Sequence, residues 1–192
     1  MQRELTDVLL RFRRNPVALM CDIAEMYLRI EVAPKDRPYQ RFLWRSLNQE
    51  RAPDEYEFNR VVSGVNSSPF QAQLFAQTHA EKHKDEFPMA AVTVLKPTYM
   101  DDSMDSVVDE SQGIKLYEEL NQLWSNAGMQ AHNWLSNSTK VLEKIPEESR
   151  ASEAHIASGG LPMVKTLRVR WLPGEDAFTF HASPPEKDFP LT

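Results

Sequence analysis

The feature that most constrains this sequence is a short apolar run, residues 17–21, that stops abruptly at Asp22. Apolar side chains at helical spacing precede it in residues 4–14, and Asn15-Pro16 predicts the end of that helix. An apolar run of this length after a helix stop is typical of a buried strand. We therefore expect Asp22 at the carboxyl end of a strand in the core.

Three further pairs of short runs predict antiparallel strands. They are residues 39–44 with 56–62, residues 91–95 with 104–108, and residues 164–171 with 177–180. The second pair flanks the sequence Tyr99-Met100-Asp101-Asp102. This hairpin is therefore expected to carry acids at its tip.

Two segments predict longer helices. The first begins at Ser68, as the cap, with Pro69 in its first turn, and Phe70 and Leu74 continue on one face. The second spans residues 114–127, where apolar residues recur at spacings of three and four. The glycine that follows it, at position 128, supplies a C-terminal stop.

This order of elements indicates an α+β fold, because hairpins rather than regular crossovers connect the strands. We expect an antiparallel sheet with helices packed on one face. Asp22 and the pair Asp101-Asp102 could then meet at one edge of that sheet.

Composition limits the possible classes of function. The chain has 192 residues and a formal net charge of −6, which excludes a basic, histone-like binder of nucleic acid as the default. The single cysteine, Cys21, cannot form an internal disulfide, so a reducing compartment is expected. No apolar stretch is long enough to cross a bilayer. We expect a soluble, intracellular and cytoplasmic protein with no membrane partner.

Carboxylates that converge on one point repel each other, and a fold that gathers them usually has a cation to hold. Oxygen ligands select Mg²⁺ or Mn²⁺, and a pair of such ions serves phosphoryl transfer. Spacing alone leaves a second interpretation open, in which the acids lie on a solvated hairpin tip.

Several ordered motifs resemble reverse transcriptases. YMDD at residues 99–102 is the tetrapeptide that marks this family, and DIAEMY at 22–27 is similar to the first acidic motif of its palm. The stretches VVSGVNSSPF, NWLSNSTKVL and VKTLRVRW lie in the expected order and resemble, in particular, Bel/Pao-type long-terminal-repeat retrotransposons. The resemblance covers nearly the whole chain. It implies a reverse-transcriptase palm over residues 1–182, followed by a disordered tail over 183–192.

The resemblance also implies the catalytic residues. Asp22 and Asp101 would bind two Mg²⁺ or Mn²⁺ ions, with the carbonyl of Ile23 as a further ligand. Asp102 would be the auxiliary acid at the same metal site. The reaction implied is RNA-directed DNA polymerisation by two-metal nucleotidyl transfer, on an RNA or DNA template-primer with deoxynucleoside triphosphates.

Nucleotide and primer contacts follow from the same motifs. Tyr27 matches the aromatic residue that excludes a ribose 2′-hydroxyl, and Gly64 would let the backbone approach the substrate. Met100 would lie beneath the primer terminus, and Trp171 matches the strand pair that seats the primer end. For Tyr27 and Trp171, packing in the core is the alternative interpretation.

The sequence departs from the family pattern at three positions. Ser63 replaces a large apolar residue before Gly64, Asn133 replaces a lysine that is a candidate proton donor, and Arg168 replaces a glycine. An amide such as that of Asn133 cannot donate a proton to a leaving group in that way.

Two interpretations of function remain. In the first, the chain is a partial polymerase that lacks the fingers and thumb, is inactive alone, and works with the remaining polyprotein segments. In the second, it is a decayed or host-adopted, non-catalytic remnant that acts as a binding module.

Overall fold

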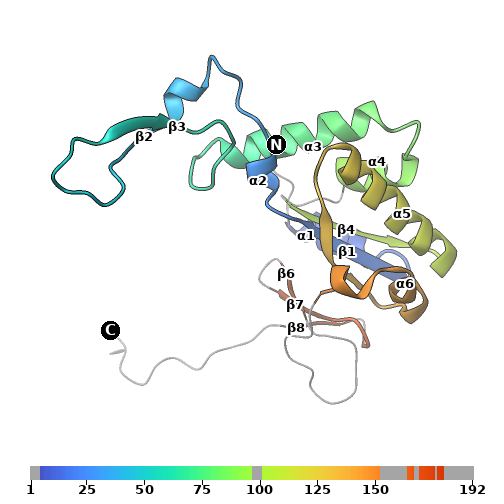
Figure 1. Cartoon of the computed structure of the whole chain (residues 1–192). Helices are drawn as coiled ribbons and strands as arrows, with labels where there is room; N and C mark the ends of the chain where they lie inside the picture. The colour runs from blue at the N-terminus through green and yellow to red at the C-terminus, as the bar shows by residue number, and fades with distance from the viewer. Residues whose placement is uncertain (1–4, 97–100, 152–163, 167–168, 176, 180–192) are drawn as a thin grey trace, which may run out of the picture.

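The computed structural model describes residues 5–96, 101–151, 164–166, 169–175 and 177–179. Its central element is an antiparallel sheet with the strand order β4-β1-β5 (Figure 1). The strands are β1 (Val17–Ile23), β4 (Asp102–Val107) and β5 (Ala131–Ser136). β1 lies in the middle, as its apolar sequence predicts, and every residue of it except Asp22 is buried.

Helices α4, α5 and α6 pack on one face of this sheet, and α3 packs against α4 (Figure 1). Alternate residues of β1, which are Val17, Leu19, Cys21 and Ile23, point into the core beneath them. The α+β fold is therefore confirmed, with these helices on one face of the antiparallel sheet and the N-terminal helix on the other. These helices are α3 (Ser68–Lys82), α4 (Pro88–Leu95), α5 (Glu110–Asn126) and α6 (Thr139–Lys144), and α6 leads into the 3-10 turn η2 (Glu147–Ser149).

The opposite face of the sheet carries a second core that includes the N-terminal helix α1 (Leu5–Phe12). Met20 and Met104 pack there with Phe12 and Trp171, whose rings meet edge to face at 4.7 Å between centroids. Trp171 comes from a small antiparallel sheet of β6 (Val164–Thr166), β7 (Val169–Leu172) and β8 (Ala177–Thr179). The structure has two strands, β6 and β7, where the sequence predicted one over residues 164–171. The predicted pairing with the strand that begins at residue 177 is confirmed for β7 and β8.

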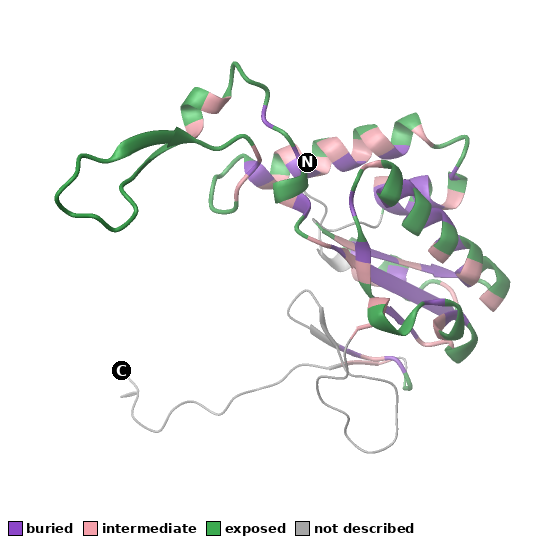
Figure 2. Cartoon of the chain, viewed as in Figure 1, coloured by how far each residue is buried: buried purple, intermediate pink, exposed green. Residues whose placement is uncertain are grey.

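A two-stranded ribbon extends away from the rest of the molecule (Figure 1). It consists of β2 (Arg41–Trp44) and β3 (Asp54–Glu57), and every residue of both strands is exposed (Figure 2). The sequence predicted this pair, but the second strand begins earlier and ends earlier than residues 56–62. The ribbon lies between the short helix α2 (Met26–Arg29), followed by the 3-10 turn η1 (Arg37–Gln40), and α3.

The strand predicted over residues 91–95 is wrong, because this segment belongs to helix α4. Pro88 occupies the first turn of that helix, where its missing N–H costs nothing. α4 packs between α3, α5 and β4, so its short sequence is apolar on several sides and lacks a helical stripe. β4 pairs with β1 instead of forming the predicted hairpin.

Helix α3 turns a different face to the core than its sequence predicts. Phe70 and Leu74 are exposed, and the buried apolar side chains are the alanines at positions 72, 76 and 80. Small side chains let α3 lie close against α4. The cap also differs: Ser67 precedes the helix, while Ser68 is its first residue and donates a hydrogen bond from Oγ to the Val62 carbonyl at 2.6 Å.

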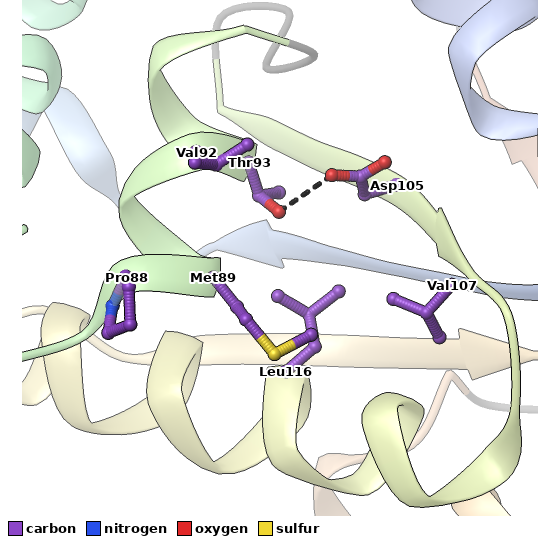
Figure 3. Close-up of a pocket in the computed structure, with 7 residues that line it drawn as sticks. All are labelled: Pro88, Met89, Val92, Thr93, Asp105, Val107 and Leu116. Atoms are coloured by element: carbon purple, nitrogen blue, oxygen red, sulfur yellow. Dashed lines mark hydrogen bonds between the residues drawn. The ribbon is translucent and has the colours of Figure 1, made fainter.

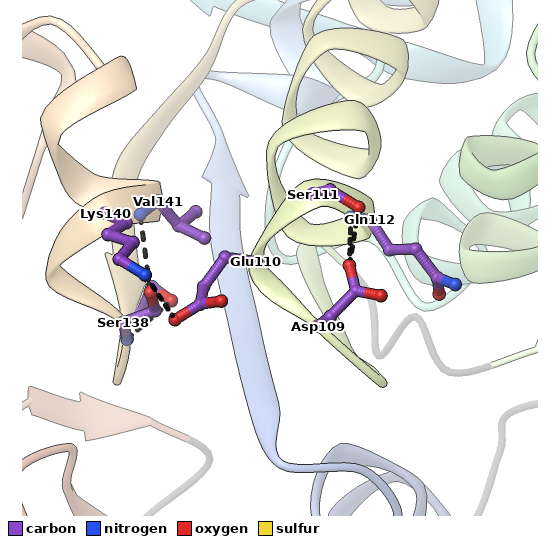
Figure 4. Close-up of polar contacts among 8 residues, drawn as sticks. Asp109, Glu110, Ser111, Gln112, Ser138, Lys140 and Val141 are labelled. Carbon is purple, nitrogen blue, oxygen red and sulfur yellow. Dashed lines mark hydrogen bonds and ion pairs between the residues drawn. The ribbon is translucent and has the colours of Figure 1, made fainter.

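Local capping fixes the starts of α5 and α6 (Figure 4). The Asp109 side chain accepts a hydrogen bond from the Gln112 N–H at 2.9 Å. The Ser138 hydroxyl accepts a hydrogen bond from the Val141 N–H at 3.4 Å. An ion pair at 3.6 Å joins Glu110, at the start of α5, to Lys140 of α6. The predicted stop of α5 is confirmed, since the glycine at position 128 adopts a φ of +67°. Across the described ranges, no helix combines the length and hydropathy needed to span a membrane.

The buried carboxylate of Glu119 caps α4 from a neighbouring helix. Its Oε2 accepts hydrogen bonds from the N–H groups of Met89 at 2.7 Å and Ala90 at 3.1 Å, and no side chain caps α4 locally. Glu119→Ala is expected to lower the free energy of unfolding by about 1–3 kcal/mol, because two N–H groups lose their acceptor. Urea denaturation measures this, and Glu118→Ala, at an exposed neighbouring position, is the control. Equal losses in the two variants would contradict the capping role.

Candidate functional site

Asp22 and Asp102 face each other at the end of the central sheet. They are direct Cα partners in the antiparallel pairing of β1 with β4. Met20 and Met104, each two residues away along its strand, belong to the core on the α1 side, so both acids lie on that face. The expectation that the acids of the two motifs meet at one edge is confirmed for this pair.

Asp101 lies in the turn just before β4. Its backbone carbonyl accepts a hydrogen bond from the Ile23 N–H at 3.2 Å, which ties this turn to the end of β1. Burial raises the pKa of the Asp101 carboxyl, and the charge of Asp22 raises it further. Asp101 is therefore close enough to Asp22 for the two charges to interact.

Asp102 has the strongest electrostatic perturbation of the three acids. Burial, then the charges of Asp101 and Asp22, raise its pKa from 3.8 to about 7. No lysine or arginine of the described residues contributes to the shifts at Asp101 or Asp102. The charges that raise these two pKa values are those of neighbouring acids, so a bound cation would relieve repulsion within the cluster.

This donor set fits a divalent cation in its chemistry. All the candidate ligands are oxygens, from the three carboxylates and the Ile23 carbonyl, and hard cations such as Mg²⁺ and Mn²⁺ prefer oxygen ligands. Within the described ranges, no group of three or more His, Cys, Asp or Glu side chains is placed to hold an ion. One or two carboxylates suffice for Mg²⁺ when substrate phosphates and water complete its coordination.

A histidine that the sequence did not single out lies against this cluster. Nε2 of His132, on β5, is 3.2 Å from Oδ2 of Asp22. The pairing of β1 with β5 is irregular at this point, since Met20 pairs with Leu135 but Asp22 pairs with His132. Asn133 is the extra residue, with a φ of +52°, and its side chain is exposed. Bulges of this kind re-aim side chains beside active sites, and no local sequence pattern announces them.

The predicted nucleotide-binding residues lie on three separate segments. Ile23 is buried directly after Asp22, at the end of β1. Tyr27 lies on α2, half-buried, and the pKa of its hydroxyl is raised by burial and by the charge of Asp101, which places it near the acids. Gly64 lies in the turn before α3 with a φ of +89° and open space where a Cβ would stand. Its backbone conformation, rather than a close contact, is what requires glycine.

One of the two predicted primer contacts, Trp171, lies within the described residues. Trp171 is fully buried against Phe12, so its ring holds β7 against α1 rather than lining a surface. Met100 and Arg168 lie outside the described residues. Ser63 is exposed in the turn before Gly64.

A cavity of about 390 Å³ lies between α4, β4 and α5 (Figure 3). Its lining is mostly apolar, with one polar pair in which the Thr93 hydroxyl donates to the Asp105 carboxylate at 2.8 Å. Asp105 is three residues after Asp102, so it points to the helix side of the sheet. The cavity is thus separated from the acid cluster by the sheet itself.

The raised pKa of Asp102 gives stability a pH dependence. Between about pH 4 and pH 7 the folded chain keeps a proton that the unfolded chain releases, so the free energy of unfolding falls as pH rises through this window. The variant Asp102→Asn lacks this titrating carboxyl, so its free energy of unfolding should not fall for this reason. Relative to that variant, the unmodified chain is expected to lose on the order of 2 kcal/mol of unfolding free energy between pH 5 and pH 8. Urea denaturation with EDTA at both pH values measures this. The exposed variant Asp36→Asn should keep the original slope, and an unchanged slope in Asp102→Asn would contradict the assignment.

Comparison with known proteins agrees with this geometry. The chain is 27% identical over 84 residues to the Pol-related polyprotein of the mouse intracisternal A-particle MIA14. That match covers 44% of this chain and 9% of the polyprotein. Residues 2–134 match the reverse transcriptase (RNA-dependent DNA polymerase) family, a span that contains all three acids and His132. Because the match extends over more than half of the sequence, the chain belongs to the reverse transcriptase family.

Proposed function

We propose that this chain provides the palm of a retrotransposon polymerase, of the Bel/Pao type, that adds deoxynucleotides to a primer on an RNA or DNA template. The observation that carries the proposal is the pairing of Asp22 with Asp102 at one strand end, with Asp101 beside them. Membership of the reverse transcriptase family supports it, and so does the similarity to a Pol-related polyprotein. The chain would act as part of a polyprotein, as the name of that relative suggests. We propose the cytoplasm as its location.

Asp22, Asp101 and Asp102 would hold the Mg²⁺ or Mn²⁺ ions. When bound, such ions neutralise the charge that develops on the attacking and leaving oxygens of a phosphoryl transfer. Tyr27, near Asp101, would restrict the space for a ribose 2′-hydroxyl. His132 would orient Asp22 through its contact with Oδ2.

A deoxynucleoside triphosphate carries several negative charges that the carboxylates and their metal ions cannot by themselves hold in place. We therefore expect the purified 192-residue chain to have little or no polymerase activity alone. Primer extension by this chain, lost in Asp22→Asn, would contradict that part of the proposal while supporting the rest.

The proposal is tested by locating the metal site with Mn²⁺ and NMR. Because bound Mn²⁺ broadens nearby resonances, the backbone signals of residues 22–27, 101–104 and 131–132 should disappear first. Signals of the exposed ribbon, residues 41–57, should persist at the same Mn²⁺ concentration. Uniform broadening, or none in the folded chain, would favour a non-catalytic remnant.

The remnant alternative has its own signature, which is the set of departures Ser63, Asn133 and Arg168. A host-adopted remnant should be a stable cellular protein with a defined partner, and a decayed copy should be absent or rapidly degraded. Immunoprecipitation from cells that transcribe the sequence separates these outcomes.

A further inference from the structure

Strand β5 has one extra residue where it passes the acid cluster. Met20 of β1 pairs with Leu135. Two residues further along β1, a regular ladder would place Asn133 opposite Asp22, but the observed partner is His132. Because side chains alternate between the two faces of a sheet, this bulge decides which side chain of β5 lies beside Asp22.

The backbone conformation of Asn133 forms this bulge. Its φ is +52°, and among the residues of β1, β4 and β5 it is the only one with a positive φ. Asparagine adopts the left-handed region more readily than most residues with a Cβ, because its short polar side chain can hydrogen-bond locally. The Asn133 side chain is exposed, so packing in the core does not select it. The backbone conformation is what this position requires.

The core on the helix side holds the bulge in place. Trp134, which follows Asn133, is 1% exposed, and its Nε1 donates a hydrogen bond to the Ala131 carbonyl at 3.3 Å. This bond spans the bulge, because His132 and Asn133 lie between the two residues that it joins. Ala131 pairs in turn with Ile23, at the end of β1. The bulge is therefore anchored at both ends, as precise placement of a side chain requires.

The bulge places the ring of His132 against one oxygen of Asp22. Nε2 of His132 is 3.2 Å from Oδ2, a distance within reach of an N–H donor, and a carboxylate oxygen only accepts. The two side chains are 31% and 33% exposed, so both border the open edge of the sheet. A contact at Oδ2 leaves Oδ1 of Asp22 for a cation and restricts the orientations of the carboxylate.

We propose that the Asn133 bulge is a positioning device, which holds His132 against Asp22 and thereby presets this carboxylate for a divalent cation. The inference rests on the proposed function, because it concerns the same metal site. His132 and Asn133 are positioning residues, since they act on the ion only through Asp22. The departure at position 133 then has a structural reason, because a left-handed backbone suits asparagine better than lysine. Asn133 is thus a requirement of the site rather than a mark of decay.

The role of His132 is tested by calorimetric titration of the purified chain with Mn²⁺. His132→Ala is expected to lower the Mn²⁺ affinity by about 10–100-fold, as the loss of a partner of a metal ligand does. His132→Gln keeps a side-chain N–H donor and should recover most of the affinity. This rescue separates the contact with Asp22 from any packing of the imidazole ring.

The role of the bulge is tested by residues that differ in their tolerance of a positive φ. Asn133→Gly adopts this conformation freely and should bind Mn²⁺ as the unmodified chain does. Asn133→Val, with a β-branched side chain, should lower the affinity toward that of His132→Ala. Asn121→Val, at an exposed position of α5, is the matched control and should leave the affinity unchanged. Circular dichroism establishes that each variant is folded.

NMR without any metal gives a second, local readout. Nuclear Overhauser contacts between the His132 ring and the β-protons of Asp22 should be present in the unmodified chain. They should persist in Asn133→Gly and disappear in Asn133→Val. The ring signals of His132 are identified by their absence from the spectrum of His132→Gln.

Three results would overturn the inference. The first is an equal Mn²⁺ affinity in His132→Ala and the unmodified chain, which would leave the metal site and the proposed function standing. The second is an equal loss of affinity in Asn133→Gly and Asn133→Val, which would assign the role to the side chain instead of the backbone. The third is a ring contact with Asp22 that survives Asn133→Val. A folded chain that binds no Mn²⁺ would overturn the proposed function itself, together with the presetting of Asp22 for a cation.

Discussion

Calorimetric titration of the purified chain with Mn²⁺ is expected to show binding that the double variant Asp22→Asn, Asp101→Asn loses. Asp22 faces Asp102, and burial with neighbouring acids raises the pKa of Asp101 and Asp102, so a cation relieves a repulsion built into the fold. The expected loss of affinity is at least about 100-fold, since removal of outer-shell partners alone costs about 10–100-fold.

The pH dependence of this binding follows from the same acids. Mn²⁺ displaces the proton that Asp102 retains below about pH 7, so affinity should rise from pH 5.5 to pH 7.5. Asp36→Asn, which replaces an exposed acid away from the cluster, should bind as the unmodified chain does. Equal affinity in the double variant, or no binding by a chain that circular dichroism shows to be folded, would contradict the metal site.

Trp134→Ala is expected to lower the free energy of unfolding by about 3–5 kcal/mol, which is comparable to the total stability of many domains. Trp134 lies on β5, is 1% exposed, and meets the Tyr117 ring edge to face at 4.9 Å. Its Nε1 donates a hydrogen bond to the Ala131 carbonyl at 3.3 Å. Truncation leaves a cavity beneath α5 beside the strand that presents His132.

The control for this prediction is the same substitution at Trp44. That side chain is 47% exposed on the ribbon, so Trp44→Ala should change the stability of the core by less than about 1 kcal/mol. Urea denaturation followed by far-ultraviolet circular dichroism compares the two variants. Similar losses would mean that Trp134 is less tightly packed than its burial indicates.

The sequence predicts those helices and strands in which each face has one environment, either the core or the solvent. β1 reads as a buried strand because each of its two faces packs in an apolar core, and α5 reads as a helix because one face meets the sheet and the other meets water. The same reasoning fails for α4. A short helix that is packed on several sides has no hydrophobic periodicity, so its sequence resembles that of a buried strand. In α3, the alanines that face α4 give a weaker hydrophobic pattern than the exposed Phe70 and Leu74.

The candidate site also contains residues whose placement the sequence predicts and residues whose placement it does not. Asp22 and Asp102 could be paired from sequence, because each lies at the boundary between an apolar strand and a turn. His132 could not, because its place beside Asp22 depends on the bulge at Asn133. The burial of Trp171 depends on contact between residues 12 and 171, which no local pattern encodes.

Because β1 pairs with β4 residue by residue, the site depends on the lengths of these two strands more than on their composition. A single inserted or deleted residue in either strand would turn Asp22 or Asp102 to the helix side, since side chains alternate with every residue. The loop between β2 and β3 has no such constraint, because it connects two exposed strands. Among divergent copies of this sequence, changes of length should therefore accumulate in residues 45–53 and be lost from residues 17–23 and 102–107.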